Sequence, residues 1–313
     1  METFLLLKCR MHKSPPQSRR VGLIGLGLMG RGLGLSLLRA GHALTVLAHR
    51  QRSVVDELVA AGAHEAANAA MLAETVDTVL LCLPSTEAVD AVLFGNQGVT
   101  SGASPGLLVL ESSTLRPDVG RRLAQQLAAR GIDFVDAPVT RGPAEAVQGR
   151  LLALVGGTDE AVQRAEPVLR AYCEQLFRFG GPGQGYAAKL INNFLAFSNL
   201  VAVAEAMHTA RQAGLDLSTL LAAVHLSGGQ NRVLDGLTPL LTGAGAAKSR
   251  VTLNTAHKDA QYYQQLAHGL GSSGPLAQLL EQQLGRALAA GLGGQLTPDY
   301  LDHVVSGSLG KTP

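Results

Sequence analysis

The stretch "VGLIGLGLMGRGLGLSLLRAGHAL", residues 21–44, places Gly25, Gly27 and Gly30 in the array G-x-G-x-x-G. A short apolar run precedes the glycines and a helix-sized segment follows them, after which Gly41 leads into a second apolar run, "ALTVLA". A dinucleotide-binding turn needs this strand–turn–helix–strand context, whereas a glycine-rich turn without a ligand does not. The stretch therefore predicts a βαβ unit that binds a nucleotide cofactor, with a ligand-free turn as the alternative.

The three glycines are expected to serve different purposes in such a turn. Gly25 permits the tight turn, Gly27 lets the backbone approach a pyrophosphate, and Gly30 allows the helix to pack closely on the strand. The helix that starts there offers free N–H groups and the positive end of its dipole to phosphate oxygens. We therefore predict cofactor contacts from Gly25, Gly27, Leu28, Met29 and Gly30.

The end of the second strand bears on the choice between NAD and NADP. An NAD site usually places Asp or Glu about 20 residues beyond the glycines, where the carboxylate binds the ribose hydroxyls. This chain has His49, Arg50 and Arg52 there, and no carboxylate occurs before Asp56. Guanidinium groups suit a 2′-phosphate because they offer charged, bidentate donors. The stretch predicts NADP rather than NAD, with solvated surface arginines as the alternative.

The pattern of the glycine turn continues along the chain to about residue 181, as short apolar runs alternating with helix-sized segments such as 31–40, 54–61 and 119–129. The runs are "VGLIG", "ALTVLA", "TVLLCL", "LLVLES", "FVDAPV", "LLALVG" and "LFRFG". Many are continuously apolar, as expected of strands buried on both faces. This order predicts an α/β fold with a Rossmann-type doubly wound sheet.

The character of the sequence changes at Tyr186, beyond which helices separated by glycine-rich breaks are expected and no convincing strand is found. We predict a dinucleotide-binding domain over residues 21–182 and an all-α domain for substrate binding and oligomerisation over residues 183–306. Residues 1–20 and 307–313 are predicted to be tails. The basic N-terminal segment favours a disordered tail or an early start codon, with a transit peptide as the alternative.

Composition narrows the function classes. The chain has 313 residues, of which 46% are hydrophobic and 16% charged, as in a globular protein. Its net charge of +2 gives no reason to expect nucleic acid or an acidic membrane surface as a partner. The three cysteines have no metal or disulfide spacing, so we expect reduced thiols, no metal site and a cytoplasmic protein.

One charged residue interrupts the apolar stretch "GQGYAAKLINNF", residues 183–194. Asn192 and Asn193 follow Lys189 at helical spacings of three and four, so the three side chains project from neighbouring parts of one face. The surrounding apolar residues predict a helix buried between the two domains. Burial lowers the pKa of an amine, which makes Lys189 a candidate proton donor or acceptor. A solvated surface lysine is the alternative.

Four motifs together resemble the β-hydroxyacid dehydrogenase family, the group of 3-hydroxyisobutyrate dehydrogenase, tartronate semialdehyde reductase and glyoxylate/succinic semialdehyde reductase. They are "GLIGLGLMG", "DAPVTRGPAEAVQGRLLALVGG", "GQGYAAKLINN" and "AHKD", and the resemblance covers residues 21–306. It implies that Lys189 is the catalytic lysine and that Asn193 orients the substrate.

The resemblance also implies cofactor contacts outside the glycine turn. Leu83 and Pro84, in "CLPST", and Thr114, in "ESSTLRP", fall where the family lines the nicotinamide pocket. Lys258, in "AHKD", falls where a lysine of the C-terminal domain closes over the cofactor. A local surface pair of Lys258 with Asp259 is the alternative.

The substrate loop departs from the family's usual Ser-Gly-Gly and has Thr140, Arg141 and Gly142 instead. The Thr140 hydroxyl and the Gly142 N–H can still donate to a substrate carboxylate. Arg141 resembles the sulfolactaldehyde reductase branch, which implies that it holds a sulfonate; the alternative is that it turns outward into solvent. That branch is expected to use NAD, which disagrees with the prediction of NADP, so the substrate stays open.

These observations predict reversible hydride transfer between NADP(H) and a small 3-hydroxy acid, or a sulfonate analogue, and its semialdehyde. We expect a homodimer or homotetramer. The resemblance implies that an imine reductase would carry Asp or Tyr in place of Lys189, and that a decarboxylating 6-phosphogluconate dehydrogenase would have a longer helical domain. A non-catalytic NADP-binding sensor is the alternative from another class.

Overall fold

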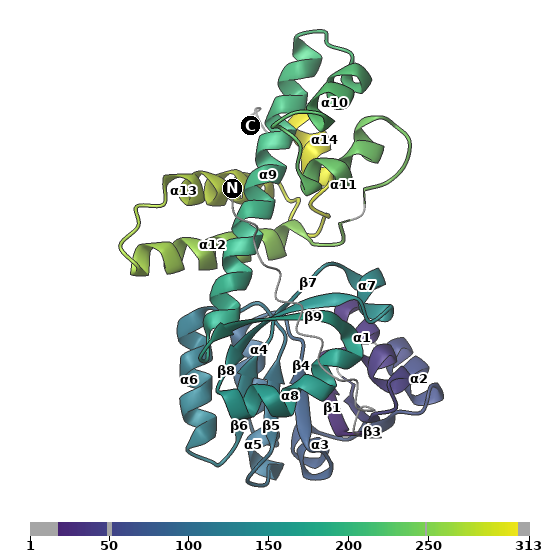
Figure 1. Ribbon diagram of the computed structural model, residues 1–313, viewed down its shortest axis with the longest axis vertical. Helices are drawn as coiled ribbons and strands as arrows, with labels where there is room; N and C mark the ends of the chain where they lie inside the picture. The colour runs from purple at the N-terminus through teal and green to yellow at the C-terminus, as the bar shows by residue number, and fades with distance from the viewer. Residues whose placement is uncertain (1–17, 49–51, 248, 306–313) are drawn as a thin grey trace, which may run out of the picture.

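The first βαβ unit has the predicted form. In the computed structural model, which describes residues 18–48, 52–247 and 249–305, β1 (Arg20–Ile24) leads through α1 (Leu28–Arg39) into β2 (Ala43–Leu47) (Figure 1). The two strands pair in parallel, with Val21 opposite Leu44. The glycine turn therefore lies at the carboxyl end of β1, which is where open α/β sheets bind ligands.

Within the described residues, nine strands form one sheet in the order β3-β2-β1-β4-β5-β6-β8-β7, with β9 also paired to β8. The strands from β3 to β6 run parallel, β8 is antiparallel to β6 and β7, and β9 is parallel to β8. The strands not yet bounded are β3 (His64–Ala66), β4 (Thr78–Leu81), β5 (Leu108–Glu111), β6 (Asp133–Asp136), β7 (Val139–Thr140), β8 (Leu151–Gly157) and β9 (Cys173–Gly180). The predicted doubly wound sheet is confirmed.

Two details of the sheet differ from the sequence prediction. β3 was not predicted because its three residues, His64–Ala66, contain no apolar run. The run "FVDAPV" is divided into β6 and β7, yet Val135 pairs with Gly157 and Thr140 pairs with Leu152 in one unbroken register. The run is therefore one antiparallel partner of β8, and only its first half also pairs with β5.

Helices cover both faces of the sheet, which explains why its central strands are apolar throughout. Leu80 of β4 packs into one core, while its neighbours Val79 and Leu81 pack into the other. Successive side chains of a strand point to opposite faces, so a strand covered on both sides needs apolar residues at every position. The covering helices not yet bounded are α2 (Arg52–Ala60), α3 (Ala69–Thr75), α4 (Thr86–Phe94), α5 (Val99–Gly102), α6 (Pro117–Ala128), α7 (Pro143–Val147) and α8 (Asp159–Tyr172).

The helical part begins with α9 (Gln184–Gln212), which runs from the sheet up through the other helices (Figure 1). It packs against α6 and β8 of the sheet part and against α12, α13 and α14. These helices bury a third core. The remaining helices are α10 (Leu217–His225), α11 (Arg232–Leu241), α12 (Leu253–Gly269), α13 (Pro275–Ala289) and α14 (Asp299–Val305).

The length and composition of α9 would also allow it to cross a membrane, and it is the one helix of the described residues for which this holds. Length and composition are weak grounds, because the core helix of a globular protein meets the same test. α9 packs against both parts of the molecule and buries apolar residues such as Leu190, Phe197 and Leu200 there, while Ile191 and Leu195 are exposed.

Candidate active site

The backbone of the glycine turn is shaped as the three glycines require. Gly25 has a φ of 102°, and a Cβ atom there would lie 2.2 Å from the Cys82 carbonyl oxygen. A Cβ on Gly30 would lie 1.9 Å from the Gly25 carbonyl oxygen. By contrast, a Cβ on Gly27 would meet no atom of the described residues within 4 Å. The turn therefore leaves space beside Gly27, where a pyrophosphate would fit.

The start of α1 has N–H groups available beside this space. Gly27 is the N-cap residue and offers no side-chain acceptor to the first turn of the helix. Leu28 is 64% exposed, and Met29 is partly buried. Because the first N–H groups of a helix have no partner inside it, they can donate to phosphate oxygens. The structure thus brings the five residues predicted from the glycine turn together around this space, and their contacts with a phosphate stay a prediction.

The predicted 2′-phosphate site is only partly described. His49 and Arg50 lie outside the described residues, whereas Arg52 is the first residue of α2. Arg52 forms ion pairs with Asp56 at 2.9 Å and with Glu65 at 2.6 Å. Two carboxylates therefore balance its charge in this structure, and its predicted contact with a 2′-phosphate stays a prediction.

The two loops expected to line the nicotinamide pocket are joined to each other. Leu83 and Pro84 follow β4, Thr114 follows β5, and the Leu83 N–H donates to Ser113 Oγ at 2.7 Å. Adjacent parallel strands place their carboxyl ends side by side, so residues far apart in sequence meet at this edge of the sheet.

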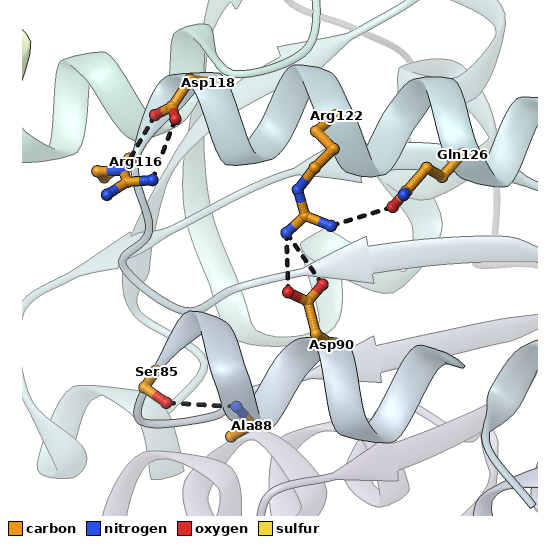
Figure 2. Close-up of polar contacts among 7 residues, drawn as sticks. All are labelled: Ser85, Ala88, Asp90, Arg116, Asp118, Arg122 and Gln126. Carbon is orange, nitrogen blue, oxygen red and sulfur yellow. Dashed lines mark hydrogen bonds and ion pairs between the residues drawn. The ribbon is translucent and has the colours of Figure 1, made fainter. Parts of the chain in front are cut away.

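The helices that follow the two loops are also linked (Figure 2). Ser85 caps α4 by accepting a hydrogen bond from the Ala88 N–H. Arg122 of α6 donates to both carboxylate oxygens of Asp90 on α4, at 3.0 and 2.9 Å. Because both side chains are 38% exposed, this pair contributes at most about 1 kcal/mol to stability.

Lys258 reaches from α12 to the loop after β5. Its Nζ donates to the Thr114 carbonyl oxygen at 2.9 Å and lies 3.1 Å from Asp259 Oδ1. It also lies 5.0 Å from the centre of the Tyr262 ring. The pairing with Asp259 is thus part of a contact between the two domains rather than a local surface pair.

Lys189 lies on α9, where it is partly buried and close enough to Lys258 and Asp259 for their charges to affect it. The pKa of Lys189 is lowered to about 8, chiefly by burial; the negative charge of Asp259 opposes this shift, and the positive charge of Lys258 adds to it. No described residue accepts a hydrogen bond from Lys189 Nζ, whereas Asn193 Nδ2 donates to Asp259 Oδ2 at 2.7 Å. The structure therefore brings Lys189, Asn193, Asp259 and Lys258 close to one another.

The loop predicted to bind the substrate, residues 140–142, is the part of the candidate site whose donors are least available to an anion in this structure. Arg141 has a φ of 76°, which is uncommon for a residue with a side chain. Its guanidinium forms an ion pair with Glu174 of β9 at 2.7 Å and donates to the Arg150 carbonyl oxygen. The Gly142 N–H donates to Glu145 Oε2 at 3.1 Å. Two of the predicted anion donors thus already have protein acceptors, while Thr140 is partly buried at the end of β7.

Sequence reasoning missed four polar residues of this region. Asp259 was interpreted only as a surface partner of Lys258, although it is buried and binds Asn193. Glu111, Asp136 and Tyr186 are completely buried at the junction between the sheet and α9. A carboxylate at the end of each apolar run "LLVLES" and "FVDAPV" was the available signal, since such strand ends form the ligand-binding edge.

Two family models match the chain in succession. The model described as "NAD binding domain of 6-phosphogluconate dehydrogenase" matches residues 20–181. The model described as "NAD-binding of NADP-dependent 3-hydroxyisobutyrate dehydrogenase" matches residues 183–300. The first covers the sheet and the second covers α9 and most of the other helices.

Similar proteins extend over nearly the whole chain. The 3-sulfolactaldehyde reductase of Escherichia coli (strain K12) is 35% identical over 286 residues, 91% of this chain and 95% of that protein. The crystal structure of 3-hydroxyisobutyrate dehydrogenase from Salmonella typhimurium has a TM-score of 0.80 at 30% identity and covers 90% of this chain and 99% of that chain. The structure of Psf3 in complex with NADP+ and 2-OPP has a TM-score of 0.80 at 26% identity, with coverage of 90% and 99%.

Proposed function

The chain belongs to the β-hydroxyacid dehydrogenase family and is an NAD(P)-dependent oxidoreductase, and on this basis we propose a more specific reaction for it. It interconverts a small anionic 3-hydroxy acid, or its sulfonate analogue, and the corresponding semialdehyde with NADP(H), and Lys189 is the general acid and base. The observation that carries the proposal is the Lys189 amine, which donates a hydrogen bond to no residue in the described part of the chain and whose pKa is lowered to about 8.

A pKa of about 8 lets Lys189 act in both directions of the reaction near neutral pH. Bound NADPH supplies the hydride for reduction. The protonated amine donates its proton to the aldehyde oxygen during reduction, and the neutral amine accepts a proton from the hydroxyl during oxidation.

Asn193 is suited to hold the reacting oxygen beside Lys189, because it lies one helical turn further along α9. An amide nitrogen carries two N–H donors, and one of those on Nδ2 points to Asp259. The other is left for a substrate oxygen. The bond to Asp259 also restricts the rotation of the side chain, so that the amide is oriented before the substrate binds.

The anionic end of the substrate is assigned to Thr140, Arg141 and Gly142. For Arg141 to bind an anion, the guanidinium has to exchange Glu174 for the substrate or contact both. A planar guanidinium has five N–H donors, so two anionic partners are compatible with its chemistry. The similarity to a 3-sulfolactaldehyde reductase supports a substrate that carries a sulfonate or carboxylate.

NADP is proposed over NAD on the basis of the stretch that contains His49, Arg50 and Arg52. The family model that matches residues 183–300 is described by an NADP-dependent enzyme, and Psf3 binds NADP+. Both support the proposal.

A homodimer or homotetramer is proposed as well. A groove of about 610 Å³ runs along the carboxyl-terminal half of α9, lined mainly by apolar residues such as Ala206, Met207 and Leu220. Such an apolar groove favours contact with another chain. Light scattering after size-exclusion chromatography should give a mass of two or four chains, and a monomer at micromolar concentration would contradict this proposal.

The reaction is tested by following NADPH consumption over a panel of aldehydes. The panel contains glyoxylate, succinic semialdehyde, tartronate semialdehyde, methylmalonate semialdehyde and sulfolactaldehyde, with NADH as the alternative cofactor. We expect turnover of at least one anionic member, lost in Lys189→Ala. Tight NADPH binding without turnover of any member would instead favour a non-catalytic sensor.

A further inference from the structure

Two buried carboxylates hold the beginning of α9 from the strand ends below it. Asp136, at the end of β6, accepts hydrogen bonds from the Gly183 N–H at 2.7 Å and from the Tyr186 N–H at 3.1 Å. Glu111, at the end of β5, accepts a hydrogen bond from the Tyr186 hydroxyl. Both carboxylates and the tyrosine are completely buried.

Asp136 and Tyr186 occupy space that glycines leave open. A Cβ on Gly156 would lie 2.7 Å from Asp136 Oδ1, and a Cβ on Gly185 would lie 2.8 Å from Asp136 Oδ2. A Cβ on Gly120 of α6 would lie 2.9 Å from the Tyr186 ring. Three separate elements therefore admit these side chains only because they carry glycine at the point of contact.

The same network continues to the loops expected to bind the nicotinamide. The Ser113 N–H lies 3.1 Å from both Glu111 oxygens, and Ser113 Oγ accepts the Leu83 N–H at 2.7 Å. The connected groups thus run from the loop after β4, through the loop after β5, to Tyr186. Lys189 stands three residues further along α9, about 4.5 Å along the helix axis.

We propose that Glu111 and Tyr186, together with Asp136, are positioning residues that set Lys189 at its working distance from the nicotinamide loops. The inference rests on the proposed role of Lys189. A general acid has to be within hydrogen-bond reach of its proton acceptor, and an error of about 1 Å in placement can lower the rate about a hundredfold. The helix that carries the lysine and the loops that face the reacting carbon are therefore held through one carboxylate.

Burying the Glu111 and Asp136 carboxylates is energetically unfavourable, which supports a role for them beyond stability. Burial raises the pKa of Glu111 to about 7 and that of Asp136 to about 6. Well-packed apolar residues often stabilise a protein as well as or better than buried ionic groups do. Buried polar groups in fixed hydrogen-bonded geometry instead limit the arrangements that the surrounding elements can adopt.

Tyr186→Phe tests the inference, with Tyr172→Phe as the matched control. Tyr172 is also completely buried, and its hydroxyl lies 3.4 Å from Ser112 Oγ, beside Glu111, but it belongs to α8 rather than to α9. On the aldehyde that the wild type turns over best, Tyr186→Phe should lower kcat about tenfold or more, while KM and NADPH affinity change less than about threefold. The isotope effect with 4-deuterated NADPH should rise, because hydride transfer becomes more rate-limiting. Tyr172→Phe should keep kcat within about twofold of the wild type at a similar loss of Tm.

An unchanged kcat in Tyr186→Phe, or equal losses of kcat in both variants, would overturn the positioning role. Lys189→Ala, assayed in parallel, separates this outcome from failure of the proposed function. Turnover retained in Lys189→Ala would contradict the role of the lysine and with it the inference. Turnover lost in Lys189→Ala but normal in Tyr186→Phe would overturn the positioning role alone.

Discussion

The glycine turn and the substrate loop differ in what determines their geometry. At Gly25 and Gly30 the neighbouring backbone leaves no room for a side chain, so the required residue type follows from local structure. At Arg141 the direction of the side chain depends on Glu174, which is 33 residues away on another strand. A site built from backbone can be predicted from a short motif, whereas a site built from side-chain pairs cannot.

The largest effect on stability is expected from alanine at Gly30, because its Cβ would lie 1.9 Å from the Gly25 carbonyl oxygen. We expect Gly30→Ala to destabilise the protein by about 3 kcal/mol and lower Tm by roughly 10 °C. Gly27→Ala is the matched control, since its Cβ meets no described atom within 4 Å and should change stability by less than about 0.5 kcal/mol. It should nevertheless weaken NADPH binding about tenfold or more, because the methyl group enters the space for the pyrophosphate. Equal Tm losses in the two variants would show that the local backbone does not explain the motif.

The substrate loop is tested by separating Arg141 from Glu174. If Arg141 binds the substrate anion, Arg141→Ala should raise KM for an anionic semialdehyde roughly 10–100-fold, because a hydrogen bond to a charged group is worth about 1.5–3 kcal/mol. Glu174→Gln should lower KM by up to about fivefold, since the substrate anion no longer competes with a carboxylate for the guanidinium, and a solvent-exposed ion pair is weak. A neutral aldehyde serves as the control and should show neither change. Unchanged KM in both variants would leave Arg141 with a structural role only.

A smaller effect is expected at Arg52, which is predicted to contact the cofactor and which forms ion pairs with carboxylates, as Arg141 does. Because Asp56 and Glu65 both pair with it, Arg52→Ala should weaken NADPH binding less than about threefold. Arg50→Ala should weaken it about tenfold or more, while NADH binding stays the same in both variants. Fluorescence titration measures these affinities. An equal loss of NADPH affinity in the two variants would mean that Arg52 leaves its carboxylates for the 2′-phosphate.

The contrast between local backbone patterns and pairs of side chains distant in sequence also explains which features can be predicted from the sequence. The continuous apolar runs predicted the central strands, since burial on both faces leaves a clear pattern, but the three residues of β3 have no such pattern. Lys189 and Asn193 were predicted because an amine and an amide stand out in an apolar helix. The bond between Tyr186 and Glu111 spans 75 residues, and no local signal in one of them indicates the other. Contacts of this kind follow from the fold, so they require the structure.

The role of Lys189 is tested most directly by the dependence of the reaction on pH. The ratio kcat/KM for reduction should fall as the pH rises through about 8, because the proton donor is then lost, and the ratio for oxidation should rise over the same range. Lys189→Ala should lose roughly 10²–10⁴-fold in activity and show no transition near that pH. Reduction that increases with pH through this range, or a Lys189→Ala variant with the wild-type profile, would contradict the account.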